Sequence, residues 1–531
     1  MKTKSRWADA LRSEPGLHKL TQVWILAFFL VSCFGLTQSP GFNHDESLIA
    51  APALSLLRTG HLQIAAAGPD DDRENSYFYQ TPLFPVALAG LFKLLGTGLW
   101  QGRFLSLLLA AATLIVLARA LRPWGNLAGL MGVVLLSVDP VFVERGRLIR
   151  YDMPAMIGAL AGFILLAGFF VRTPAANLHP PRQVRAFLAG LCLGLAVEAH
   201  FLYVLYVGAF GLLILIFSEA EAVGFKVRIG RAGLFTLGFL VAMIPFALYA
   251  LAHPAGFRQQ FLFQLSFHHG QSPKGMGLIQ GEIAKYHDYY MWTPMWLAAV
   301  GVAFAFAAAL LLKDRRQSQP AASAGAATLY RQVVFLAVLM PLLLAFTSGH
   351  WYWHHLMVAP VWAMLIAATA ARAWREMRPR LWRPGVLLVF ALAAAANGWL
   401  VNWGYRAYAA VGTWNTWYSP AVLEQIKALV PPGSRVYGDF RLIFLADQQH
   451  WDFTFYQVQF PQDAETLKKI PFDYLVFPAG LQPWPNYELV AEVKNLPSPL
   501  PLPQFNPTRG DMIMNMKIYV RKTSPPVPVP R

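Results

Sequence analysis

Long apolar segments recur along most of the chain, separated by short polar connections. Most of them are long enough to cross a hydrocarbon layer about 30 Å thick. They cover residues 20–37, 82–98, 103–121, 125–141, 153–171, 184–199, 200–217, 232–252, 291–312, 331–347, 354–372 and 384–403. This pattern predicts a helical protein that crosses a membrane many times.

The charges in the connections predict which side of the membrane each one faces. The N-terminal stretch MKTKSRWADALR is basic, and so are the connections RTPAANLHPPRQVR, SEAEAVGFKVRIGR, KDRRQSQPAASAGAATLYR and RAWREMRPRLWRP. Basic connections remain on the cytoplasmic side. We therefore expect the N-terminus inside, and the loop 253–290 and all residues after 403 outside.

An inside N-terminus and an outside C-terminus require an odd number of crossings, yet the pattern holds twelve apolar segments. We interpret 125–141 as re-entrant or half-length, because it is short and contains the turn signal VDP. About eleven crossings then remain, and Asp152 lies outside. Arg145, Arg147 and Arg150 also lie there, against the positive-inside trend, which indicates an anionic ligand.

The composition changes after residue 403. SPAVLEQIKALVPPGSRVYGDF predicts a short amphipathic helix, a turn and a strand, and FDYLVFPA, YELVAEVKN and DMIMNMKIYVRK predict further strands. We therefore divide the chain into a transmembrane domain, 1–403, with external loops 38–81 and 253–290, and a small extracytoplasmic α/β domain, 404–531. SPPVPVPR forms a Pro-rich tail to this domain.

Composition agrees with a membrane protein. Of the 531 residues, 56% are hydrophobic and only 14% are charged, against about 25% charged in soluble proteins. The net charge of +16 comes from short basic clusters between apolar segments, so it indicates membrane orientation and not nucleic-acid binding. The two cysteines, Cys33 and Cys192, both fall in apolar segments and indicate no disulfide framework.

An acidic pair, Asp45 and Glu46, follows the first apolar segment almost at once. One interpretation is a solvated helix N-terminus, where carboxylates offset the helix dipole and cap free N–H groups. The other is a general base at the membrane surface that deprotonates a hydroxyl nucleophile. Spacing alone does not decide between them.

Two further stretches combine polar and apolar character. YFYQTPLFPVALAGLFKLLG is an aromatic and proline-rich entry into an apolar helix, which is also typical of an interfacial belt. VDPVFVERGRLIRYDMPAMIGAL places Asp152 at the start of an apolar segment, after three arginines. Asp152 and Pro154 also suit a plain helix start.

Taken in order, these stretches resemble the GT-C class of glycosyltransferases that use polyprenyl-phosphate or dolichyl-phosphate sugars. The class includes the protein O-mannosyltransferases and the lipid A aminoarabinose transferases. HDESLIAAPALSLLRTGH resembles the first external loop of that class, and YFYQTPLFPVALAGLFKLLG its PPL element, with Thr81 in place of the first proline. GRFLSLLLAAATLIVLARAL, DPVFVERGRLIRYDMPAM and AGLCLGLAVEAHFLYVL resemble later elements.

The resemblance implies a catalytic role for Asp45, the base, with Asp152 as a second essential acid in the same cavity and Glu46 beside them. Relatives that act on lipid A have an acidic-basic pair before the PPL element, where this chain has Tyr79 and Gln80. A metal or phosphate contact at that position is therefore in doubt, and Glu74 is the nearest carboxylate.

A metal site has weaker support. The loop 253–290 contains His268 and His269, and the resemblance implies that a histidine there contacts a metal; a plain interfacial histidine remains the alternative. Glu74 is a further candidate ligand. Oxygen ligands favour Mg²⁺ or Mn²⁺, and histidine admits Zn²⁺.

Further polar side chains lie at segment ends, where guanidinium groups bind phosphate and buried ionisable groups are functional candidates. Ordinary lipid-headgroup contacts and aromatic belts explain several of them equally well. The substrate-binding candidates are Arg58, Tyr77, Tyr79, Arg147, Arg150, His200 and Tyr352.

Our hypothesis is an integral-membrane, inverting glycosyltransferase. It would move a sugar from a polyprenyl-phosphate donor to a hydroxyl acceptor on the outer face of a bacterial inner membrane. The alternative is a secondary transporter or lipid flippase, which would need charges near the bilayer midplane and internal repeats. The sequence shows few of the former and no repeat.

Overall fold

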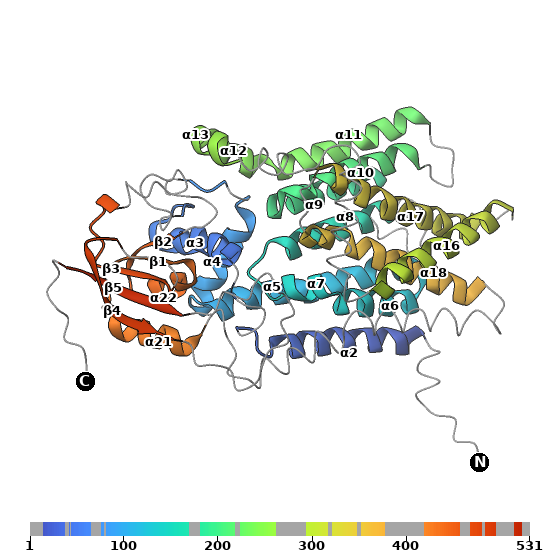
Figure 1. The fold of residues 1–531 in the computed structure, drawn as a ribbon. Helices are drawn as coiled ribbons and strands as arrows, with labels where there is room; N and C mark the ends of the chain where they lie inside the picture. Colours follow the sequence, from blue (N-terminus) through green and yellow to red (C-terminus); the bar gives the residue numbers. More distant parts are fainter. Residues whose placement is uncertain are drawn as a thin grey trace, which may run out of the picture.

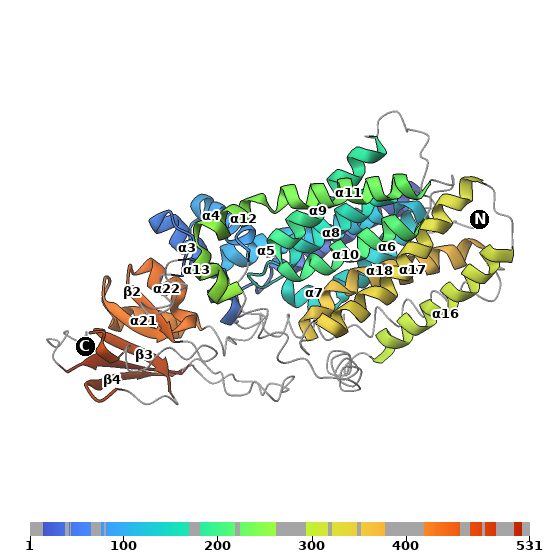
Figure 2. The same ribbon diagram turned by 90° about the horizontal axis from the view of Figure 1, so that it is seen from above.

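The computed structural model shows a long helical bundle with a small α/β domain at one end (Figures 1 and 2). The structure describes residues 14–37, 42, 44–64, 76–78, 81–168, 181–217, 224–261, 294–316, 321–347, 352–376, 419–456, 468–479, 484–494 and 515–522. The predicted boundary at residue 403 lies outside these ranges.

Apolar helices make up the bundle. They are α2 (Glu14–Cys33), α5 (Leu99–Ala120), α6 (Asn126–Val138), α7 (Pro140–Arg145), α8 (Asp152–Ala167), α9 (Arg182–Ala199), α10 (Val204–Ile216), α11 (Phe225–Ala242), α12 (Ile244–Ala252), α16 (Pro294–Arg316), α17 (Ala321–Thr347) and α18 (Ala359–Glu376). Within the described ranges, four helices are long and apolar enough to cross a membrane, or five if α11 and α12, bent by 46°, form one span. The chain is an integral membrane protein.

Glycines bring α9 and α11 into backbone contact. A Cβ atom at Gly190 would lie 1.8 Å from the carbonyl oxygen of Phe235, and one at Gly238 would lie 2.0 Å from that of Phe187. Such distances exclude any side chain. In a membrane, where apolar burial adds little to helix association, small residues of this kind allow the close packing that holds helices together.

The segment 125–141 does not turn back as predicted. At its start, the backbone N–H of Asn126 donates to Glu14 at the beginning of α2, 3.0 Å away. Beyond its end, Arg147 donates to the carbonyl oxygen of Gly35, just after α2, at 2.9 Å. Because α6 and α7 together run from one end of α2 to the other, the segment is not re-entrant. The half-length alternative fits α6 itself, which has only 13 residues.

Among the described apolar segments, α4 (Leu83–Leu95) is a short helix that does not run the length of the bundle. Before it, the Thr81 hydroxyl donates to the carbonyl oxygen of Val197 near the end of α9. After it, Thr97 donates to Asp447 of the α/β domain at 2.6 Å. Both ends of α4 therefore lie at the end of the bundle that faces this domain (Figure 1).

The α/β domain contains a five-stranded sheet of order β2-β1-β3-β5-β4. Its strands are β1 (Arg435–Asp439), β2 (Asp452–Tyr456), β3 (Tyr474–Pro478), β4 (Tyr487–Val493) and β5 (Met516–Arg521), and its helices are α21 (Pro420–Leu429) and α22 (Ile443–Gln448). β1 pairs in parallel with β2 and β3, whereas β5 is antiparallel to β3 and β4. The small sheet that the sequence predicts is confirmed, with β2 as an addition.

Helix α3 (His44–Thr59) lies between this domain and the bundle. Its Glu46 is fully buried and accepts two hydrogen bonds from Arg103 of α5, at 2.9 and 2.7 Å. The backbone N–H of Ile149 adds a third, at 2.9 Å. This ion pair therefore anchors α3 both to α5 and to the loop 146–151.

We expect that Gly190→Ala lowers the melting temperature of the detergent-solubilised protein, because the added methyl group must push α9 and α11 apart. Overpacking of this kind typically costs about 1–3 kcal/mol. Thermal unfolding followed by tryptophan fluorescence measures the effect. Gly208→Ala on α10 is the matched control, since a Cβ there meets nothing within 4 Å. Equal melting temperatures for the two variants would contradict the close contact.

We also expect that Arg103→Met strongly destabilises the fold, because it leaves the Glu46 carboxylate buried without its cation. Removing one partner of a buried ion pair costs about 3–5 kcal/mol. The yield of monodisperse protein and its melting temperature measure the loss. Arg119→Met provides the control, because Arg119 is an exposed arginine on the same helix; similar stability of both variants would speak against the anchor.

Candidate active site

Arg150 joins two carboxylates from different helices. Its Nη1 donates to Asp45, and its Nε donates to Asp152 at 3.0 Å. The Arg150 side chain is only 3% exposed, whereas Asp45 remains 24% exposed. Two acids that are 107 residues apart in the sequence are thus held beside one guanidinium group, and Asp45 remains open to solvent.

Local structure places each of these groups. Asp45 lies in the first turn of α3 and Asp152 begins α8, positions where the helix dipole favours a negative charge. Arg150 lies in the short connection before α8, and its backbone N–H donates to the Ser106 hydroxyl at 3.2 Å. The helix-start interpretation and the functional interpretation of the acidic residues are therefore both compatible with the fold.

His200 adds a titratable group on the other side of Asp152. Its Nε2 lies 3.6 Å from Asp152 Oδ1, and its Nδ1 accepts from the backbone N–H of Leu202 at 3.2 Å. In this tautomer Nε2 carries the proton and faces the carboxylate. The ring also packs edge-on against Tyr151, with centroids 4.6 Å apart.

Two buried arginines supply positive charge. Burial lowers the pKa of Arg150, but Tyr151, Asp152 and Asp45 raise it, and the net pKa lies well above its usual value. Arg145, 1% exposed, also acts electrostatically on Asp152 and Tyr151. The site therefore combines two carboxylates with two cations, which suits a ligand that bears an anionic group.

Several predicted residues have other contacts. Glu46 forms the buried ion pair with Arg103 that is described above. Arg147 donates to the carbonyl oxygens of Ser32, Phe34 and Gly35 and so caps the end of α2. Arg58 pairs with Asp447 of the α/β domain at 2.5 Å. Tyr77 is fully buried, and its backbone N–H donates a hydrogen bond to the Tyr249 hydroxyl. The structure therefore brings Asp45, Arg150, Asp152 and His200 together, whereas these other residues have partners elsewhere.

The remaining predicted residues lie outside the part of the chain that the structure describes: Glu74, Tyr79, His268, His269 and the side chain of Tyr352. Among the described residues, no group of three or more His, Cys, Asp or Glu side chains could hold a metal ion. The ligands predicted for the cation lie outside these residues, so the cation stays a prediction and we assign no chemical step to it.

The predicted site residues do not include Arg103 and Ser106, which hold Glu46 and the Arg150 backbone, although both lie in the GRFLSLLLAAATLIVLARAL element. One signal was available. Arg103 begins an otherwise apolar segment, and an ionisable residue within such a segment usually has a partner in the protein.

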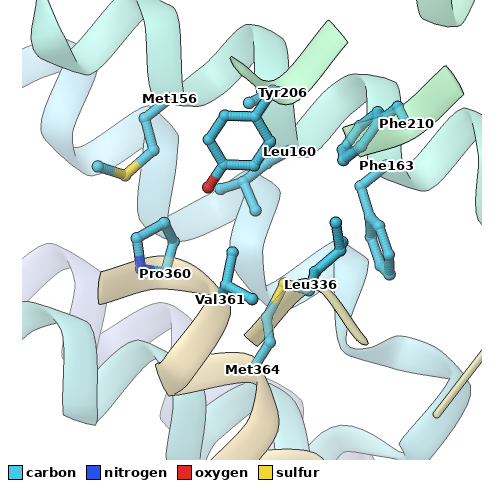
Figure 3. A pocket seen from close by; sticks show the side chains of 10 residues that line it. Met156, Leu160, Phe163, Tyr206, Phe210, Leu336, Pro360, Val361 and Met364 are labelled. Carbon is cyan, nitrogen blue, oxygen red and sulfur yellow. The ribbon is translucent and has the colours of Figure 1, made fainter. Parts of the chain in front are cut away.

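A small apolar hollow, with room for about one water molecule, lies beside α8. It is lined by residues of α8, α10, α17 and α18, and Figure 3 shows Met156, Leu160 and Phe163 of α8 on one side of it. Met156 follows Asp152 by one helical turn, which corresponds to about 6 Å of rise. Charged and apolar surfaces therefore follow one another along the same helix.

Comparison with known proteins supports this picture. Residues 58–261 match the sequence model of the dolichyl-phosphate-mannose-protein mannosyltransferase family. The matched region includes Arg150, Asp152 and His200, but Asp45 precedes it. No curated protein matches this chain.

Solved structures extend the likeness to nearly the whole chain. ArnT from Cupriavidus metallidurans bound to undecaprenyl phosphate has a TM-score of 0.57 at 15% identity, over 94% of this chain and 97% of that one. Its apo state gives a TM-score of 0.55 at 15% identity, over 86% and 92%. The resemblance to the GT-C class that the sequence motifs indicate is thus confirmed, and the chain has the fold of the ArnT glycosyltransferase.

Proposed function

We propose that the protein is an inverting glycosyltransferase that moves a sugar from a polyprenyl-phosphate donor to a hydroxyl acceptor. The observation that carries the proposal is Arg150, buried between a partly exposed Asp45 and Asp152. A carboxylate next to a fixed cation, at one end of a membrane bundle, is the arrangement that a base and a phosphate-binding group require.

The reaction would take place in one displacement. The acceptor oxygen attacks the anomeric carbon from the face opposite the phosphate, and the bond between that carbon and the phosphate oxygen breaks. Asp45 takes the hydroxyl proton. Arg150, together with the charge of Arg145, stabilises the negative charge that develops on the departing polyprenyl phosphate.

Asp152 and His200 would act on the site and not on the acceptor. Asp152 holds Nε of Arg150 at 3.0 Å, which keeps the guanidinium plane in place when Asp45 becomes neutral. His200 faces the other oxygen of Asp152. The local charge therefore stays balanced as the proton moves, in an environment where an uncompensated charge is costly.

A lipid-linked donor has support from two features. The site lies at the end of an apolar helical bundle, so the prenyl chain of a donor whose phosphate lies at Arg150 would remain within the membrane. The ArnT structure of the same fold is described as bound to undecaprenyl phosphate. The acceptor would be a hydroxyl on a protein, lipid or glycan.

The proposed topology places this end of the bundle outside a bacterial inner membrane. About eleven segments would cross, with the N-terminus cytoplasmic and the α/β domain periplasmic. The placement of α4, which keeps both its ends near the α/β domain, supports an odd number of crossings. A divalent cation held by His268, His269 or Glu74 stays a prediction; assay of EDTA-treated protein, with and without added Mg²⁺, Mn²⁺ or Zn²⁺, tests it.

Asp45→Asn removes the proton acceptor with little change in shape, so we expect turnover to fall by about 10²–10⁴-fold, the usual contribution of a general base. Release of polyprenyl phosphate from a polyprenyl-phosphate sugar by the purified protein measures it. Glu488→Gln, at an exposed position on β4, loses the same charge away from the site and should keep wild-type turnover. Normal turnover in Asp45→Asn would exclude the mechanism.

Arg150→Lys keeps the positive charge but loses the planar fork that contacts both carboxylates and a phosphate. We expect inhibition by the product polyprenyl phosphate to weaken roughly tenfold, equivalent to about 1.4 kcal/mol. The inhibition constant, measured alongside the melting temperature, reports the effect. Arg435→Lys changes an exposed arginine of the α/β domain and should leave the constant unaltered; an unchanged constant in Arg150→Lys would remove Arg150 from the phosphate site.

A further inference from the structure

The α/β domain contacts the helix that bears Asp45 at both of its ends. Just before α3, Phe42 is fully buried and lies against Phe440 and Phe444 of the domain, with ring centroids 6.1 Å apart in both pairs. At the other end of α3, Arg58 pairs with Asp447 of α22 at 2.5 Å and also donates to its backbone carbonyl at 2.8 Å.

Asp447 joins three elements. Its Oδ1 accepts from Arg58 of α3, and its Oδ2 accepts from Thr97, which follows α4, at 2.6 Å. The Asp447 side chain is 12% exposed, whereas that of Arg58 is 43% exposed, so solvent partly screens the ion pair and the Thr97 hydrogen bond adds to it. One carboxylate of the α/β domain therefore joins the C-terminal ends of α3 and α4.

The turn that carries Phe440, which contacts Phe42, is itself held in place by hydrogen bonds. Asp439, at the end of β1, accepts from the Arg441 backbone N–H at 2.9 Å and from the Arg441 side chain at 2.7 and 2.9 Å. Both side chains are nearly fully buried. This pairing fixes the turn that presents Phe440 to Phe42.

Contacts at only one end of α3 would restrain the other end less well. Pro52 lies inside the helix, where it cannot donate a hydrogen bond to the preceding turn and weakens the coupling between the two halves. In the first turn, the Glu46–Arg103 ion pair already holds α3 to the bundle, and the α/β domain adds a second restraint beside Asp45. Phe42, three residues before Asp45, restrains that half directly.

We propose that the α/β domain positions the active site: by holding α3 at Phe42 and at Arg58, it sets the place of Asp45 relative to Arg150. Phe42 and Asp447 are then positioning residues that act through Asp45. The catalytic part of this inference rests on the proposed function, whereas the restraint on α3 does not. Misplacement of a reacting group by about 1 Å lowers rates by up to about 10²-fold.

The test uses the full-length protein in detergent, with the variants Asp447→Ala and Phe42→Leu. Asp452→Ala is the matched control, because Asp452 forms an exposed ion pair with Arg435 in the same domain and does not contact α3 in the described structure. Hydrogen–deuterium exchange of the α3 amides, 44–59, measures the restraint. Donor kcat and KM measure its effect on catalysis.

We expect both variants, but not the control, to speed exchange in α3 at least fivefold and to lower kcat about tenfold with KM within twofold of wild type. A loss of kcat without a change in KM separates positioning from donor binding. Exchange in β1 and β3 should stay at the wild-type rate, which separates it from unfolding of the domain.

Exchange in α3 that is unchanged in both variants would overturn the proposal, and so would a control that behaves as they do. If faster α3 exchange occurs and kcat is unaffected, the positioning role is excluded while the restraint stands. If the wild-type protein does not turn over the donor at all, the proposed function fails, and the exchange experiment still decides whether the domain restrains α3.

Discussion

The pairing of buried charge organises one end of this molecule. An ion removed from water costs several kcal/mol unless a partner of opposite charge or several hydrogen bonds compensate it. Arg103 meets that requirement with Glu46, Arg150 with Asp45 and Asp152, and Arg147 with the free carbonyl oxygens after α2. These contacts join α2, α3, α5 and α8, so the candidate active site and the packing of the bundle end depend on the same arginines.

The acidic pair illustrates how one motif serves two purposes. Adjacent residues on a helix point about 100° apart, so Asp45 and Glu46 cannot share an environment. Glu46 turns into the protein and is fully buried by Arg103, whereas Asp45 remains 24% exposed beside Arg150. The buried acid fixes the first turn of α3 to the bundle, and this contributes to the defined position of the exposed acid.

Apolar character alone does not distinguish a membrane crossing from a helix packed at the end of a bundle. The segments 82–98 and 125–141 are both apolar and both short. α4 buries its apolar face against α3 and α5 in the cluster that also contains Phe440 and Phe444. α6 and α7 instead extend along α2. The helix is interrupted at Asp139–Pro140, where the Asp139 side chain caps α7 by accepting a hydrogen bond from the Phe142 N–H at 2.9 Å.

The sequence by itself determined that the chain is a helical membrane protein with a small terminal sheet, because hydrophobic periodicity reports directly on burial in lipid or in a core. It also indicated Asp45, Arg150, Asp152 and His200, through the resemblance of the motifs to the GT-C class and the position of these residues at the ends of apolar segments. Only the tertiary structure decided that α4 remains at one end of the bundle, that Arg58 and Arg147 are used in packing, and that Arg103 anchors Glu46. Those outcomes depend on which partners lie within about 3 Å of a charged group, and contacts between residues far apart in the sequence leave no local pattern.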